Sequence, residues 1–105
     1  MAIWKHFMKI EAGENVVLVL HTPREKLLGI VDEIGSSGVF IKAIELGYFE
    51  DWCSSISRGE QYLPMSDQFI PMWRVERISR DESSSGSDSM AEQFEKRTGY
   101  KFGDV

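Results

Sequence analysis

The sequence of 105 residues holds a single cysteine, Cys53, and only two histidines, His6 and His21. One cysteine cannot build an internal disulfide framework, and no pair among these three residues has the spacing of a zinc site. No apolar run approaches the ~20 residues of a membrane helix, and the first residues lack a signal-peptide pattern. We therefore expect a cytoplasmic protein that makes no membrane contact and carries no metal or other cofactor.

The sequence also lacks a recognisable catalytic constellation. Cys53 could pair with a distant histidine in a hydrolase, but no local motif around it supports that chemistry. Asp32 and Glu33 are adjacent carboxylates, and neighbours in a strand point to opposite faces, which makes them poor partners in acid–base catalysis. We expect that the protein is not an enzyme.

The formal charge is −5, of which residues 1–80 contribute −2 and residues 81–105 contribute −3. Indiscriminate binding to duplex nucleic acid relies on many phosphate contacts, which an acidic chain disfavours. A local aromatic or basic site for single strands stays compatible with this balance.

Three apolar runs dominate the first half of the chain: Val16–Leu20, Leu27–Val31 and Val39–Ile44. They are short, rich in Val and Ile, and separated by Gly, Ser and Pro, which predicts strands over about 15–21, 26–34 and 39–46. Short connections favour antiparallel neighbours, and a segment over 68–79, interrupted at Pro71, is expected to complete the sheet.

The remaining segments read as helices and loops. Apolar spacing over residues 2–10 predicts a short amphipathic helix. Residues 47–66 form a long insertion, with a helical turn expected near Tyr48–Trp52 and loop over Ser54–Gly59. Residues 81–89 are expected to be a mobile linker, followed by a helix over 90–98 that Ser89 caps and Gly99 ends. The expected division is a β-domain over 1–80 and a linker with a short helix over 81–105.

A helix followed by five strongly bent strands is the order of a small Sm-type β-barrel, and residues 2–79 resemble the Sm/LSm (Hfq-like) superfamily. The resemblance rests on apolar positions of the first three strands, on the glycine that lets the second strand curl, and on the spacing of the last two strands: Val17, Leu18, Leu20, Gly29, Val31, Val39, Ile41, Ile70, Val75 and Ile78. It implies a mainly β fold, in which a short N-terminal helix precedes a five-stranded antiparallel barrel.

Two turns differ from the family pattern. The second turn reads Gly35-Ser36-Ser37-Gly38 where the family has Asp-x-apolar-Asn, and Pro71-Met72 stand where it has Arg-Gly or Lys-Gly. In the family these turns build the base-binding pocket, and subunits form rings by pairing the fourth strand of one with the fifth of the next. The resemblance therefore implies a homomeric ring with altered pocket chemistry.

Four residues of these turns are the candidate nucleic-acid-binding residues. Trp73 offers an aromatic face for a base and Arg74 a guanidinium for phosphate, whereas Ser36 and Ser37 offer hydrogen-bond donors. The alternative is that Trp73 packs under a neighbouring subunit, Arg74 is a solvated charge, and the serines form an ordinary polar turn.

The candidate oligomer interface comprises aromatic and apolar residues of the insertion and the last two strands: Tyr48, Trp52, Phe69, Ile70, Val75 and Ile78. The leading hypothesis is a ring that binds single-stranded RNA or DNA and acts in nucleic-acid processing. The alternative is a structural or protein-interaction barrel without nucleic-acid binding, for example a phage assembly component. The tail over 81–105 either recruits a partner, packs on its own domain or on the next subunit, or stays partly disordered.

Overall fold

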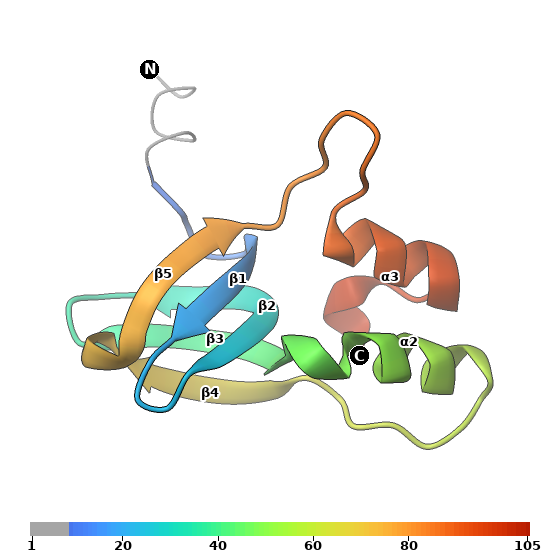
Figure 1. Ribbon diagram of the computed structural model, residues 1–105, viewed down its shortest axis with the longest axis horizontal. Helices are drawn as coiled ribbons and strands as arrows, with labels where there is room; N and C mark the ends of the chain where they lie inside the picture. The colour runs from blue at the N-terminus through green and yellow to red at the C-terminus, as the bar shows by residue number, and fades with distance from the viewer. Residues whose placement is uncertain (1–8) are drawn as a thin grey trace.

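The computed structural model describes residues 9–105, and Figure 1 shows a curled sheet beside a helical layer. The strands are β1 (Asn15–Leu20), β2 (Glu25–Ile34), β3 (Gly38–Glu45), β4 (Ser66–Pro71) and β5 (Val75–Arg80). The helices are α2 (Phe49–Ser57) and α3 (Met90–Thr98), with 3-10 turns η1 (Leu46–Tyr48), η2 (Met72–Arg74) and η3 (Phe102–Asp104). The helix expected over residues 2–10 falls mostly on residues 1–8, which lie outside the described residues, and Lys9 and Ile10 belong to no helix.

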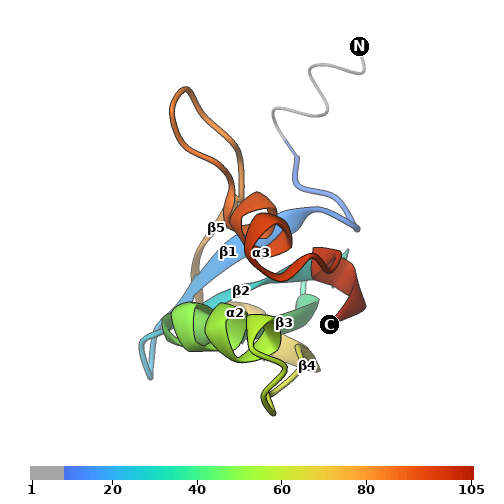
Figure 2. The ribbon, with the colours of Figure 1, turned by 90° about the vertical axis from the view of Figure 1, so that its right-hand side faces the viewer.

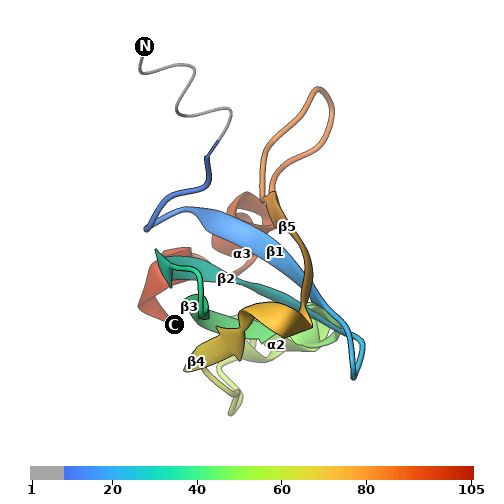
Figure 3. The same ribbon diagram turned by 90° about the vertical axis from the view of Figure 1, so that its left-hand side faces the viewer.

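The five strands form one antiparallel sheet in the order β4-β3-β2-β1-β5. Short turns join β1 to β2 and β2 to β3, whereas β5 returns to pair with β1. The antiparallel five-stranded sheet expected from the apolar runs is confirmed. The sheet is open: within residues 9–105, β4 and β5 are its two edges and do not pair with each other. Figure 3 shows how strongly the sheet curls, with η2 linking β4 to β5.

Each face of the sheet packs a separate core. The inner face carries the buried side chains Val16, Leu18, Leu20, Leu27, Val31, Val39, Ile41, Ala43 and Ile70. The outer face carries Leu28 and Ile44, which pack against residues of α2, α3 and η3. Strands buried on both faces explain why the apolar runs of β1 to β3 are nearly continuous rather than alternating.

Helices α2 and α3 lie side by side over one half of the outer face (Figure 2). Trp52 of α2 stacks on Phe94 of α3 with ring centroids 4.3 Å apart, and Phe102 meets both rings edge-on. Trp52 is fully buried within its own chain, so its predicted interface role is corrected: its side chain has no surface left for a neighbour. The loop expected over Ser54–Gly59 is also corrected, because α2 continues to Ser57 and buries Ile56.

Gly29 allows β2 and β3 to approach closely at the centre of the sheet. A Cβ atom at this position would lie 2.3 Å from the Lys42 carbonyl oxygen and 2.6 Å from the Ala43 Cβ. Real Cβ atoms do not tolerate such contacts, so only glycine fits without movement of β3. The close backbone approach expected for this glycine is therefore present.

The segment between β5 and α3 is held at both ends rather than loose along its whole length. The Asp81 backbone N–H donates to the Asn15 carbonyl, and the Asp81 carboxylate accepts from the N–H groups of Met90 and Ala91 at 2.7 and 2.9 Å. Ser89 caps α3 by accepting from the Glu92 N–H, and Gly99 ends it in a left-handed conformation, as expected. The tail over 81–105 thus packs on its own sheet.

Candidate nucleic-acid interface

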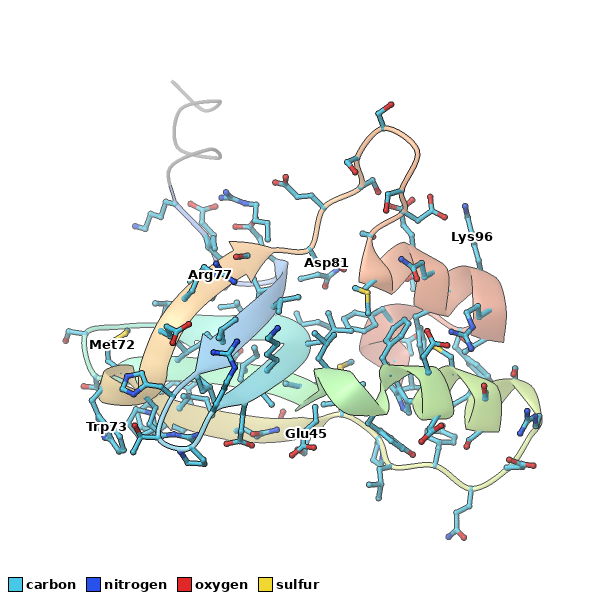
Figure 4. The ribbon with its side chains drawn as sticks, viewed as in Figure 1. Glu45, Met72, Trp73, Arg77, Asp81 and Lys96 are labelled. Atoms are coloured by element: carbon cyan, nitrogen blue, oxygen red, sulfur yellow. The ribbon has the colours of Figure 1, made fainter. Side chains whose placement is uncertain are left out.

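The turn between β2 and β3 and the 3-10 turn η2 lie together at one end of the sheet. The Met72 N–H donates to the Ser37 carbonyl oxygen at 2.9 Å, and Gly38 pairs with Pro71 across β3 and β4. We call residues 35–38 and 72–74 the turn end. It brings together all four predicted nucleic-acid-binding residues, and Figure 4 shows Met72 and Trp73 projecting from it.

Trp73 presents most of its indole to solvent, with 64% of the residue exposed. Its one ring contact within residues 9–105 is with His21, edge-on at 6.4 Å between centroids. Ser36 and Ser37 are exposed as well. The geometry therefore leaves an open aromatic face beside a polar turn, which is the arrangement that base stacking requires.

The guanidinium of Arg74 points inward instead of toward a ligand. It donates to the carbonyl oxygens of His21 and Pro23 and to the Glu25 carboxylate at 2.7 Å. Only 17% of its side chain is exposed. Arg74 therefore holds the β1–β2 turn against η2, and most of its donors are already used.

Phe40 and Phe69 form an exposed aromatic pair on the outer face next to the turn end. Their ring centroids lie 4.7 Å apart, and each residue is almost half exposed. Asp32 and Asp67 line a hollow of about 280 Å³ on one side of the pair. On the other side Glu33 lines a hollow of about 340 Å³ that reaches Ser36 and Ser37.

Among residues 9–105, the cationic side chains near this region are mostly engaged with other groups of the chain. Arg74 is paired with Glu25, and Lys42, opposite Asp67 in register, donates its ammonium to the Gly103 carbonyl at 2.9 Å. Arg24, in the β1–β2 turn, is well exposed and lies 4.0 Å from Glu76. A phosphate at the turn end would thus meet few free positive charges.

The other predicted interface residues occupy different environments. Ile70 is buried in the inner core, whereas Val75 and Ile78 are half-buried against it. Phe69 is exposed on edge strand β4, and the Tyr48 hydroxyl accepts a hydrogen bond from the Leu63 N–H. Three of these residues, Phe69, Val75 and Ile78, therefore keep apolar surface at the sheet edges.

Cys53 lies in the core between the sheet and the helices and is fully buried. Burial raises the pKa of its thiol, with the Arg97 charge opposing the shift and the Glu50 charge adding to it. No cluster of three or more potential metal ligands occurs among residues 9–105. In the same part of the chain, no helix combines the length and apolarity needed to cross a membrane.

In comparisons with known proteins, no protein family model, no curated protein and no solved structure matches this chain.

Sequence reasoning missed Phe40 and Met72, which are exposed at or beside the turn end. Phe40 lies between the buried residues Val39 and Ile41, so strand alternation puts its side chain on the opposite face of the sheet. Whether that side chain is exposed depends on how far the helices cover this face. The sequence therefore indicated the face on which Phe40 lies, but it did not indicate which part of that face the helices leave uncovered.

Proposed function

We propose that this chain is an Sm-like subunit that assembles into a homomeric ring and binds single-stranded nucleic acid, with RNA favoured, at the turn end. Two observations support the Sm-like reading. The sheet order β4-β3-β2-β1-β5 leaves the fourth and fifth strands as the two edges, the strands through which Sm-like subunits pair. The strong curl of the sheet is compatible with a barrel-like subunit whose edge strands pair with those of neighbouring subunits.

The open edges supply the physical reason for assembly. A strand at a sheet edge presents unpaired N–H and C=O groups and is a template for another strand. Pairing β4 of one copy with β5 of the next uses both edges at once, and such a head-to-tail contact closes into a ring when the rotation between copies allows it.

The observation that carries the binding proposal is the exposed Trp73 next to the Ser36-Ser37 turn. An indole face stacks on any base, and turn N–H and hydroxyl groups donate to base edges or phosphate. A ring repeats this pair once per subunit, so that several weak contacts along one strand add up.

Stacking, rather than phosphate neutralisation, is the main contribution in this proposal, because Arg74 is engaged with Glu25 and the carboxylate of Glu33 lines the hollow that reaches Ser36 and Ser37. Each phosphate contact to a single strand contributes about −0.7 to the slope of log affinity against log salt. We therefore expect a shallow salt dependence, with a slope of about −1 or weaker per subunit bound.

A fluorescence-anisotropy titration tests the proposal, using labelled oligo(U), oligo(A) and a matched DNA at low and physiological salt. Stacking of one base is worth about 1–3 kcal/mol, so Trp73→Ala is expected to weaken binding about 5- to 150-fold. Tyr100→Ala is the matched control, because Tyr100 is also more than half exposed but follows α3, at the helical end. Equal affinities for the two variants, or no binding by the wild type at any salt, would reject the site.

A second candidate function is an assembly scaffold that contacts only proteins. The inward-facing Arg74 and the carboxylates of Asp32, Glu33 and Asp67 beside the aromatic pair favour it. The absorbance ratio of protein purified without nuclease separates the candidates, because a nucleic-acid binder carries host RNA and a pure scaffold does not.

A further inference from the structure

We propose that the uncovered part of the outer face is a docking surface for a basic segment of a partner protein, whose arginine side chains lie against the rings of Phe40 and Phe69. The inference goes beyond the nucleic-acid site at the turn end and does not depend on it. We call the two rings and the carboxylates beside them, those of Asp32, Glu33 and Asp67, the aromatic–acidic patch.

The aromatic–acidic patch lies beyond the part of the sheet that the helices cover. On β3, Ile44 is buried in the core with the helices, whereas Phe40, on the same face, is 45% exposed. A strand rises about 3.3–3.4 Å per residue, so these two side chains are ~13 Å apart along β3. Phe69, opposite Phe40 on β4, is 44% exposed. The rest of residues 9–105 therefore leaves this aromatic surface open to a partner.

The two rings are held in place within the chain. Their centroids lie 4.7 Å apart, with an angle of 47° between the ring planes. The Phe69 ring also lies against Gly38, because a Cβ atom at Gly38 would be 2.8 Å from its Cζ and 2.9 Å from its Cε1. The partner would therefore meet a surface whose geometry is already formed, which lowers the entropy lost on binding.

A β-bulge brings two carboxylates to the Phe40 side of the aromatic–acidic patch. The register of β2 with β3 passes from Val31 opposite Ile41 to Glu33 opposite Phe40, so Asp32 is the extra residue. In a regular strand the two acidic side chains would point to opposite faces. Here Asp32 lines a hollow of about 280 Å³ on one side of the rings, and Glu33 lines one of about 340 Å³ on the other. The bulge therefore concentrates negative charge beside the aromatic surface.

The three carboxylates of the aromatic–acidic patch are exposed and form no ion pair within residues 9–105. Lys42 is opposite Asp67 in the register of β3 with β4. Its ammonium group, however, donates to the Gly103 carbonyl oxygen of η3 at 2.9 Å. The negative charge of the patch is therefore available to a cation of the partner.

Charge complementarity determines which partner fits this surface. The phosphates of a nucleic acid would lie next to three carboxylates, and an apolar segment would bury carboxylates without a cation, which is costly. A cation is attracted both to the ring faces and to the carboxylates. Arginine fits best, because its planar guanidinium stacks on an aromatic ring and donates two hydrogen bonds to one carboxylate. Since the hollows flank the rings, a segment that crosses them can place one arginine in each.

Fluorescence anisotropy with labelled peptides tests the inference. The probes are short peptides of alternating glycine and arginine, and counterparts with lysine or glutamine in place of arginine. We expect the arginine peptide to bind the wild-type chain at least about threefold more tightly than the lysine peptide, and the glutamine peptide not to bind. Binding is expected to weaken from low to physiological salt, because the charges that meet are exposed before binding.

Two variants test the aromatic contribution. Phe69→Ala is expected to weaken binding of the arginine peptide about 3- to 30-fold, because the cation–π contact with one ring is lost. Tyr100→Ala is the matched control, since Tyr100 is 54% exposed but follows α3 at the helical end. Circular dichroism of both variants confirms that each is folded before the affinities are compared.

Two further variants separate a specific contact from general attraction to an acidic chain. Asp67→Asn is expected to weaken binding of the arginine peptide about 2- to 5-fold, as for the loss of one exposed ion pair. Asp51→Asn removes the same charge from the exposed side of α2, away from the patch. It is expected to change the affinity less than about 1.5-fold, because salt screens distant charges.

Three results would overturn the inference: no binding of the arginine peptide at low salt, equal weakening by Asp67→Asn and Asp51→Asn, or unchanged affinity in Phe69→Ala. Trp73→Ala distinguishes this surface from the turn end, because it is expected to leave peptide binding unchanged. If Trp73→Ala weakened peptide binding as much as Phe69→Ala, the peptide would lie at the turn end instead, which would contradict the inference. If Phe69→Ala dissociated an assembly of the free chain, the rings would belong to a contact between copies, which would contradict it as well.

Discussion

Arg74 and Glu25 form an ion pair of 2.7 Å that joins the end of η2 to the start of β2. The same guanidinium donates to two carbonyl oxygens of the β1–β2 turn, so one side chain closes the end of the sheet next to Trp73. Arg74 therefore holds in place the turn next to Trp73. Its loss is expected to lower the stability of the fold more than it lowers the affinity for a ligand.

Arg74→Ala is expected to lower the free energy of unfolding by about 1–3 kcal/mol, since it removes charge-assisted hydrogen bonds from a mostly buried group. Arg24→Ala is the matched control in the same turn, because Arg24 is exposed and only 4.0 Å from Glu76, and it is expected to cost less than about 0.5 kcal/mol. Urea denaturation of both variants measures the difference. Equal stability would show that Arg74 is not structural.

Gly29→Ala is expected to destabilise the sheet by about 1–3 kcal/mol, because the added methyl group meets the Lys42 carbonyl and the Ala43 side chain. Gly47→Ala is the control, since a Cβ atom there meets nothing within 4 Å. Thermal unfolding compares the two. A neutral Gly29→Ala would mean that β2 and β3 are further apart than the structure has them.

Asp81→Ala is expected to loosen α3 by about 0.5–2 kcal/mol, because the first helical N–H groups lose their carboxylate acceptor. Glu82→Ala, at the exposed next position, is expected to have little effect. Hydrogen exchange is the measurement, with faster exchange predicted in α3 and unchanged exchange in β1 to β3. Uniform acceleration would indicate global rather than local destabilisation.

Cys53 is expected to react with a thiol reagent only after unfolding, because it is fully buried and its pKa is raised. The folded state keeps the thiol protonated above the pH at which the unfolded thiol, with a reference pKa of 9.0, ionises. Its contribution to stability is therefore complete below about pH 9 and declines at higher pH. The difference in stability between wild type and Cys53→Ala, followed from pH 7 to 10.5, is predicted to shrink; a constant difference would contradict it.

The strands of this fold could be predicted from sequence because β-branched runs and turn residues are local signals. The Ser89 cap and Gly99 likewise marked α3. The extension of α2 through Ser54-Ser55 could not be predicted, because serines have modest helix propensity and the helix depends on burying Ile56 and Cys53 against the sheet. Tertiary packing decided that segment.

The candidate site was predictable in position but not in the role of each residue. The Gly, Ser and Pro residues of the sequence predicted the two turns that hold Ser36, Ser37 and Trp73. Sequence could not show that Arg74 faces inward, because its acceptors come from His21, Pro23 and Glu25, about fifty positions away. Nor could the sequence show that the Trp52 ring is buried against Phe94, because α2 and α3 are distant in the sequence and meet only in the folded chain.

The most direct measurement is sedimentation velocity of the untagged chain from about 1 to 100 µM at physiological salt. The subunit mass is 12.0 kDa, and the proposed pairing of β4 with β5 predicts one closed species at several times this mass that persists on dilution. A single species of 12.0 kDa across the range would contradict edge-to-edge assembly and, with it, the Sm-like ring.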